Sequence, residues 1–259
     1  MCADVHWMGV AGSGERGAEA SLNGGMGRVM YQSFLDFQQQ AAQDGRTVTA
    51  EAVVYPATAV PLDGGLLDWA GFIGSVDQGA AALGAQYATY VAQCPTSKVV
   101  LAGYSQGAMV VHRNLQVLDA SPNMSAALLI ADGDRRPEDP TLNLGTANSV
   151  PGERLGVAQD WPILAHAPAP LPVSVGSRTI SVCDYSDPVC DYDPDADEDE
   201  VSKRAIAIHT SYADGDYSWV APLNQLVAMA PTPVVVPPVP VVAPPAPAPG
   251  PAPIDMMQS

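Results

Sequence analysis

The chain has 259 residues, of which 47% are hydrophobic, enough for one large domain or two small ones with a real core. It has 11 lysines and arginines against 28 aspartates and glutamates, which gives a net charge of −17. Such an acidic surface repels the phosphates of nucleic acids and of anionic lipid headgroups. We therefore expect neither nucleic acid nor an anionic membrane surface as a partner, and no transmembrane segment.

The chain contains four cysteines: Cys2, Cys94, Cys183 and Cys190. An even number that includes a close pair indicates disulfides and an oxidising compartment. No C-x-x-C pair occurs, which disfavours a zinc or redox site. No signal peptide is visible before the first apolar run, so we expect an exported protein whose signal was removed. A lipid-modified Cys2 is the alternative to a disulfide at that position.

Short apolar runs alternate with helical patterns along the chain. Strands are expected at 5–10, 48–55, 98–102, 126–131 and 179–183, and helices at 25–42, 73–92, 108–118 and 218–229. Strands that alternate with helices form a parallel, doubly wound sheet. The sequence therefore predicts an α/β fold with a five-stranded central sheet and helices on both faces.

Two segments stand apart from this alternation. Residues 134–176 are rich in proline and glycine and contain the apolar stretch WPILAHAPAPLPV; long loops of this kind are often functional covers, so we expect an insert near the active site. Residues 231–253 contain 11 of the 25 prolines, which prevents a packed helix or strand there. We expect one domain over 1–229 and an extended proline-rich tail over 230–259, either a spacer to a wall or partner or an end without a role.

The stretch VVLAGYSQGAMVV, residues 99–111, places one serine between a buried strand and a helix. Its GYSQG core matches G-x-S-x-G, which marks a nucleophile elbow when a strand precedes it and a helix follows. Glycine fits on each side because so tight a turn brings the flanking backbone close to the serine. The turn directs the Gln106 N–H and the helix N-terminus at any oxyanion formed at Ser105. An ordinary glycine-flanked turn is the alternative.

A serine hydroxyl becomes a good nucleophile only when a base takes its proton. Of the four histidines, His209 follows the last expected strand and precedes the last helix, in a loop that reaches the carboxyl edge of the sheet. We therefore expect His209 to be the base. The other three, which are ordinary core residues on the simplest interpretation, are His6, His112 and His166.

The acid that orients the base is expected between nucleophile and base, in the order Ser, Asp, His. Asp187 lies in the stretch CDYSDPVC, inside the loop that a disulfide between its cysteines would close. Asp132, at the end of another expected strand, is the second choice. The acidic run DYDPDADEDE at 191–200 could offer calcium ligands, but the EF-hand glycine and spacing are missing. We favour a solvated loop there and expect no metal and no cofactor.

Several motifs together resemble the cutinase family of serine esterases, in its actinobacterial secreted form. They are CPTSKVVLAGYSQGAMVV, CDYSDPVC and the late HTSY, with VAGSGERG and VVYPA similar to the ends of the family's first two strands. The resemblance covers about residues 2–229 and implies an α/β-hydrolase fold. The insert, the acidic run and the proline-rich tail are additions to the compact members of the family.

The resemblance implies a role for each candidate residue. Ser105 is then the nucleophile, Asp187 the acid and His209 the base of a catalytic triad. The amides of Ser13 and Gln106 form the oxyanion hole, which the Ser13 hydroxyl assists.

It also implies two disulfides, one joining Cys2 to Cys94 and one joining Cys183 to Cys190. The second would hold the carboxylate of Asp187 still.

The leading interpretation is a secreted or cell-wall-associated monomer that hydrolyses carboxylic esters of lipid-like or polyester type. Tyr104 and the apolar residues 161–173 favour acyl chains over sugars, and the expected acyl contacts are Trp161, Ile163 and Leu164. A carbohydrate deacetylase similar to acetylxylan esterases and a mycolyl-ester hydrolase similar to phage lysin B remain alternatives. A non-catalytic binding module is disfavoured because all three triad positions are filled.

Overall fold

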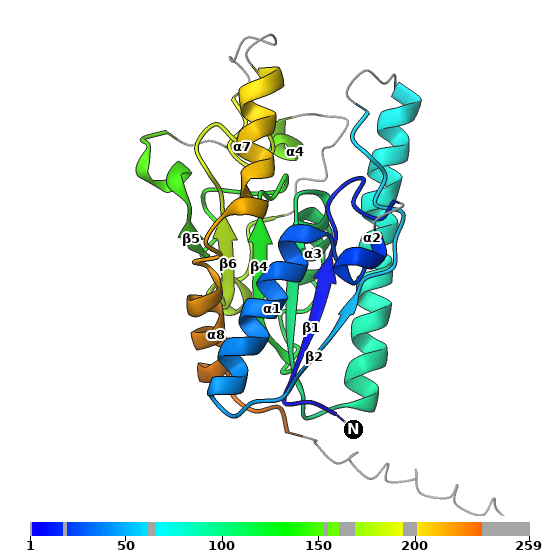
Figure 1. Ribbon diagram of the computed structural model, residues 1–259, viewed down its shortest axis with the longest axis vertical. Coiled ribbons are helices and arrows are strands. Elements are labelled where there is room, and N and C mark those ends of the chain that lie inside the picture. Colours follow the sequence, from blue (N-terminus) through cyan, green and yellow to red (C-terminus); the bar gives the residue numbers. More distant parts are fainter. Residues whose placement is uncertain are drawn as a thin grey trace, which may run out of the picture.

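The computed structural model describes residues 2–17, 20–61, 66–152, 155–160, 169–193 and 201–234. A parallel sheet with the strand order β2-β1-β3-β4-β6-β5 lies between two layers of helices (Figure 1). Its strands are β1 (Val5–Val10), β2 (Val48–Ala52), β3 (Lys98–Tyr104), β4 (Met124–Ile130), β5 (Leu142–Leu144) and β6 (Thr179–Val182).

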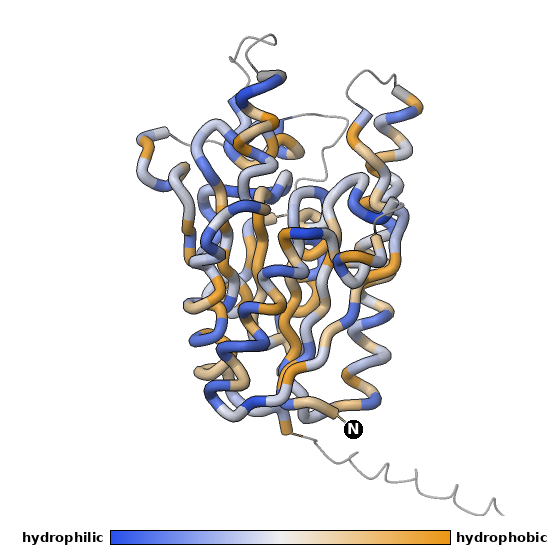
Figure 2. The backbone as a smooth tube through the Cα atoms, in the orientation of Figure 1, coloured by the Kyte–Doolittle hydropathy of each residue, from blue (hydrophilic) through white to orange (hydrophobic). Residues whose placement is uncertain are grey.

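The central strands β1, β3 and β4 are mostly apolar (Figure 2). They are almost entirely buried, as strands covered on both faces must be. The predicted doubly wound α/β fold is confirmed, but the sheet has six strands and not five. The additional strand β5 is three residues long, lies at the sheet edge beside β6 and is largely exposed. It is too short to produce a periodic signal in the sequence.

Helices cover both faces of the sheet (Figure 1). One core lies between the sheet and α1 and α8, and the other between the sheet and α2 and α3. The longer helices are α1 (Arg28–Gln43), α2 (Leu66–Gln93), α3 (Gln106–Leu115) and α8 (Val220–Met229). The shorter ones are η1 (Ala20–Asn23), η2 (Thr146–Ser149), α4 (Val157–Asp160), α5 (Val173–Gly176), η3 (Val201–Ala205), α7 (Ile206–Ser211) and η4 (Tyr212–Asp214). Within the described ranges, no helix combines the length and apolar character needed to cross a membrane.

Helix α2 begins at Leu66, seven residues before the expected start at 73. Gly71 and Gly74 lower the helix propensity of its first three turns, so the sequence pattern did not indicate that the helix begins there. Phe72 and Val76 are buried in the core on that face of the sheet, so tertiary packing stabilises the helix through the two glycines.

The insert at 134–176 contributes to both the sheet and the core. It supplies β5, and its residues Ala158, Leu171 and Val175 belong to the core beneath α2 and α3. Part of the described flanks of the insert is therefore core, whereas β5 is largely exposed at the sheet edge. Its central positions Trp161, Ile163, Leu164 and His166, most of the acidic run and the tail from 235 onward lie outside the described residues.

The strand order sets where a ligand can bind. From β1 the chain passes to β2 on one side, whereas from β3 it passes to β4 on the other, so β1 and β3 flank the point where the winding reverses. Ligands of doubly wound sheets bind outside the carboxyl ends of the strands at this point. The register pairs Val10 with Gly103, so Ser13 and Ser105, which follow them, leave the sheet at the same edge.

Candidate active site

Ser105 stands at a strained turn between β3 and α3. Its backbone has φ 53° and ψ −120°, a conformation that residues with a side chain rarely adopt. A Cβ at Gly103 would lie 2.2 Å from the Gly107 carbonyl oxygen, and one at Gly107 would lie 2.3 Å from the Val10 carbonyl oxygen. Both glycines of the motif are thus required, and the turn has the geometry of a nucleophile elbow.

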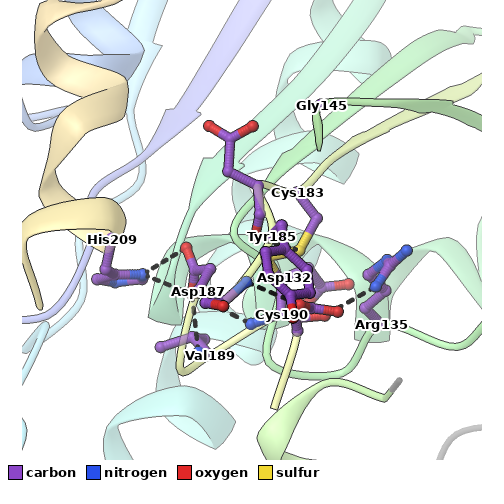
Figure 3. Close-up of a disulfide and its surroundings, with 12 residues drawn as sticks. Asp132, Arg135, Gly145, Cys183, Tyr185, Asp187, Val189, Cys190 and His209 are labelled. Atoms are coloured by element: carbon purple, nitrogen blue, oxygen red, sulfur yellow. Dashed lines mark hydrogen bonds and ion pairs between the residues drawn. A yellow bond between two sulfur atoms is a disulfide. The ribbon is translucent and has the colours of Figure 1, made fainter. Parts of the chain in front are cut away.

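The side chains of Ser105, His209 and Asp187 form one continuous line of contacts. Ser105 Oγ lies 3.0 Å from Nε2 of His209. Nδ1 of His209 lies 3.0 Å and 3.1 Å from the two carboxylate oxygens of Asp187, and Figure 3 shows these two contacts. Asp187 is fully buried and Ser105 is 5% exposed, whereas the His209 side chain is 17% exposed. The site can therefore be reached from outside at the imidazole while the carboxylate behind it stays dry.

The acid loop fixes the Asp187 carboxylate from behind. Oδ1 of Asp187 accepts hydrogen bonds from the N–H groups of Val189 at 2.7 Å and Cys190 at 3.3 Å. A disulfide between Cys183 and Cys190 closes the loop around the aspartate (Figure 3). With both ends of the loop tied together, the carboxylate has one orientation, which is toward His209.

The other disulfide joins Cys2 to Cys94. Cys2 precedes β1 and Cys94 lies between α2 and β3, so this disulfide is at the amino ends of the strands, whereas the acid loop follows the carboxyl end of β6. No free cysteine occurs among the described residues.

His209 lies on α7 and not in a loop as expected. Tyr104 holds it: the tyrosine hydroxyl donates a hydrogen bond of 2.6 Å to the His209 carbonyl oxygen, and the two rings stack with centroids 5.3 Å apart. Burial, followed by the charges of Asp187 and Glu15, raises the pKa of Tyr104, which keeps the hydroxyl a donor. Tyr104 is buried, and the contacts that the structure shows for it are with His209; its expected contact with substrate stays a prediction.

The two expected oxyanion donors lie on adjacent connections. Gln106 is the first residue of α3, so its N–H has no carbonyl four residues earlier within the helix to bind. Its side chain is directed elsewhere, with Nε2 3.3 Å from the Thr58 carbonyl oxygen. Ser13 lies in the turn after β1, where the N–H of Gly14 donates to the Ala57 carbonyl oxygen at 2.7 Å.

The family model described as Cutinase matches residues 1–217 of the chain. This chain belongs to the cutinase family. A cutinase of Hypocrea jecorina (strain QM6a) is 31% identical over 127 residues, covering 49% of this chain and 47% of that protein. Acetylxylan esterase 2 of Talaromyces purpureogenus is 28% identical over 157 residues, covering 55% of this chain and 61% of that protein. The chain thus spans about half the length of the curated relatives it matches.

Solved structures agree with this cutinase-family fold. The catalytic core domain of acetyl xylan esterase from Trichoderma reesei superposes with a TM-score of 0.57 at 21% identity, covering 89% of this chain and 100% of that one. Trichoderma reesei cutinase in complex with a C11Y4 phosphonate inhibitor gives 0.53 at 22% identity, covering 87% and 77%. At these identities the likeness concerns the fold alone.

A second histidine–aspartate pair lies inside this cutinase-family fold. Asp132, the second choice for the acid, lies 2.6 Å from Nδ1 of His112, and both side chains are inaccessible to solvent. Burial by itself lowers the pKa of His112, but the carboxylates of Asp132, Asp134 and Asp139 together raise it to about 9. Asp132 therefore pairs with His112 and not with His209.

Sequence reasoning missed two charged residues in the loop after β1. Nη1 of Arg16 donates to the carbonyl oxygens of Gly25 at 2.8 Å and Val53 at 2.9 Å. Glu15 accepts hydrogen bonds from the backbone on both sides of the loop. The sequence feature that indicates these residues is the pair of charges, Glu15 and Arg16, inside the glycine-rich stretch GSGERG after the first strand.

Proposed function

We propose that this chain is a serine carboxylic-ester hydrolase that works through an acyl-enzyme on Ser105. The observation that carries the proposal is the continuous contact from Ser105 Oγ through His209 to the carboxylate of Asp187. Membership of the cutinase family supports it. The strained elbow at Ser105 adds support, because strain of this kind persists where it holds a functional group in place.

Acylation follows from the contacts. Nε2 of His209 takes the hydroxyl proton of Ser105 as Oγ attacks the ester carbonyl carbon. The tetrahedral oxyanion is bound by the N–H groups of Ser13 and Gln106, and Asp187 stabilises the imidazolium. The imidazolium then returns the proton to the alkoxy oxygen as its bond to the carbonyl carbon breaks, so that the alcohol leaves and the acyl group stays on Ser105.

Deacylation repeats these steps with water. His209 takes a proton from the water molecule as its oxygen attacks the acyl-enzyme, and the same two N–H groups bind the second oxyanion. The proton passes to Ser105 Oγ as the acid is released, which restores the starting enzyme. Each missing oxyanion donor lowers transition-state stabilisation by about 3–4 kcal/mol.

The proposed substrates are lipid-like or polyester acyl esters. The cutinases among the relatives favour this class, whereas the relative named acetylxylan esterase 2 favours a second candidate, removal of acetyl groups from a carbohydrate. The hypothesis that Trp161, Ile163 and Leu164 contact the acyl chain concerns residues outside the described ranges and stays a prediction.

The test compares p-nitrophenyl esters of acetate, butyrate and octanoate with wild-type enzyme, Ser105→Ala and a matched control, Ser218→Ala, at an exposed serine. Wild type and the control should hydrolyse the esters, and Ser105→Ala should lose about 10⁶-fold in kcat. Rates that rise with chain length favour acyl esters, whereas activity confined to acetate favours the deacetylase. Near-normal activity in folded Ser105→Ala would overturn the proposal.

We place this activity outside the cell, in a monomer that is secreted or associated with the cell wall. The two disulfides favour an oxidising compartment. The proposed folded domain ends with α8, where the amine of Lys98 donates to the carbonyl oxygens of Val227 at 2.8 Å and Ala230 at 2.6 Å. The proline-rich residues that follow are then a tail.

A further inference from the structure

The loop after β1 is bridged to α1 by one carboxylate. Oε2 of Glu15 accepts the N–H of Gly12 at 2.7 Å, and Oε1 accepts the N–H of Arg28 at 3.0 Å. Gly12 directly precedes Ser13, and Arg28 is the first residue of α1. The two oxygens of one side chain therefore connect the loop that carries an expected oxyanion donor to the start of a long helix.

The backbone around Glu15 is shaped to receive its carboxylate. A Cβ at Gly27 would lie 2.0 Å from Oε2 of Glu15, and Gly27 has a φ of 78°, which favours glycine. A Cβ at Gly12 would lie 2.8 Å from Cδ1 of Tyr104, the residue that holds His209. Glycines on both sides thus let the carboxylate approach the backbone closely, next to the ring that positions the candidate base.

The negative charge of Glu15 is favourable at the N-terminus of α1. Helix α1 has no acidic residue in its first turn, and its N-cap Gly27 has no side chain to accept a hydrogen bond, so Glu15 supplies the anion that a helix N-terminus favours. Burial raises the pKa of Glu15, whereas the hydrogen bonds from Gly12 and Arg28 and the charge of His209 lower it. The pKa of Glu15 is raised on balance, because the two N–H groups offset the cost of burial only in part.

We propose that Glu15 is a positioning residue: by bridging Gly12 to Arg28, it keeps the N–H of Ser13 directed at the carbonyl oxygen of an ester bound at Ser105. This inference rests on the proposed function. The loop has a further tie, since Gly14 donates to the Ala57 carbonyl oxygen. Loss of the bridge should therefore weaken the oxyanion contact rather than remove it, and the effect on turnover should be smaller than that of deleting a donor.

The kinetic test uses Glu15→Gln and Glu15→Asp. The amide keeps the shape of the side chain but has one oxygen, so it can accept only one of the two N–H groups. The aspartate keeps both oxygens and the charge but is one methylene shorter. Both variants should lose about 10- to 100-fold in kcat, a loss below the 10²–10³-fold typical of a deleted oxyanion donor, with KM within about twofold of wild type. The control is Glu138→Gln, at an exposed carboxylate paired with Arg136, which should keep the wild-type values.

A second measurement follows the bridge without using activity. Amide hydrogen exchange at Gly12 and Arg28 should be at least about 10-fold faster in Glu15→Gln than in wild type and in Glu138→Gln. Unchanged exchange at these amides, or wild-type kcat in Glu15→Gln, would overturn the inference. Wild-type kcat in Glu15→Asp would also overturn it, because charge alone would then suffice. A wild-type chain that hydrolyses none of the esters would overturn the proposed function instead, and exchange would still decide whether Glu15 forms the bridge.

Discussion

Two histidines of this chain each contact an aspartate, but in different surroundings. His209 lies between Asp187 and Ser105, and its side chain is 17% exposed. His112 lies against Asp132 at 2.6 Å, and its side chain is 0% exposed. Both pairs come from loops or helices beyond the carboxyl ends of strands, and the pairing of residue types is the same.

The difference lies in what the second nitrogen of each ring meets. Nε2 of His209 meets a serine hydroxyl, whereas Nε2 of His112 faces the carboxylate of Asp139 at 3.6 Å. An imidazole between an aspartate and a serine can take the serine proton and return it, whereas an imidazole between two carboxylates is stabilised as a cation. A histidine–aspartate pair therefore becomes a base or a buried ion pair according to its other neighbour and its access to solvent.

Replacing each histidine should separate the two roles most strongly. His209→Ala should lower kcat on p-nitrophenyl butyrate by about 10⁵- to 10⁶-fold with little change in melting temperature, because it removes the proposed base. His112→Ala should lower the free energy of unfolding by about 3–5 kcal/mol, because it leaves buried carboxylates unpaired, while the folded fraction keeps its kcat. The measurements are active-site-normalised kinetics and urea unfolding. The comparison fails if folded His112→Ala is as inactive as His209→Ala.

The two disulfides should also differ in role: one should contribute mainly to stability and the other mainly to activity. Their cysteines are 92 and 7 residues apart, so chain entropy predicts a stabilisation of about 4–5 kcal/mol for Cys2–Cys94 and about 2–3 kcal/mol for Cys183–Cys190. We expect replacement of the first pair by serines to lower the melting temperature more. Replacement of the second pair should lower kcat more, by at least about 10-fold, because Asp187 loses its fixed loop.

A thermal melt and a kinetic assay of both double variants check this. The interpretation is contradicted if the variant without Cys183–Cys190 keeps full turnover, or if the variant without Cys2–Cys94 loses turnover while it remains folded.

Stability should depend on pH through His112. Its pKa is raised from 6.5 to about 9 in the folded protein, so its contribution is fully present below pH 6.5 and is lost as the pH rises through 9. The loss should be on the order of 3 kcal/mol. Burial also raises the pKa of Asp134, from 3.8 to about 6. The stability that depends on this group is therefore lost as the pH rises from 3.8 through about 6, below the range in which His112 titrates.

Urea unfolding of the wild type between pH 6 and 9.5 measures this loss, and His112→Asn should flatten the profile. An NMR titration of the His112 ring in the wild type provides an independent check. A ring that titrates near pH 6.5, or an unfolding free energy that is constant across this range, would show that the pair is not charged.

The sequence predicted those features that depend on local pattern. The elbow at Ser105 could be predicted because a strand, two glycines and a helix in succession leave one arrangement for the turn. The central strands β1 and β4 were expected within two residues of their ends, since buried parallel strands are continuous apolar runs. The choice of Asp187 relied on the resemblance to a family as well as on its place between two cysteines.

Features that depend on contacts between distant elements could not be predicted. The partner of Asp132 is on α3, twenty residues earlier, and only the packing of α3 beneath β4 brings them together. The N–H groups that Glu15 accepts are those of Gly12 and Arg28, and no pattern specifies the second. The hydrogen bond from Tyr104 to the His209 carbonyl oxygen joins residues 105 apart in the chain, and no local pattern indicates it.

Covalent labelling tests most directly the claim that the two pairs differ in role. A p-nitrophenyl alkylphosphonate reacts with a serine only when a base activates it, and mass spectrometry locates the adduct. We predict one adduct per chain, on Ser105, which forms at the wild-type rate in His112→Asn and fails to form in Ser105→Ala and His209→Ala. An adduct on another residue, or labelling of Ser105 that survives His209→Ala but not His112→Asn, would contradict the account.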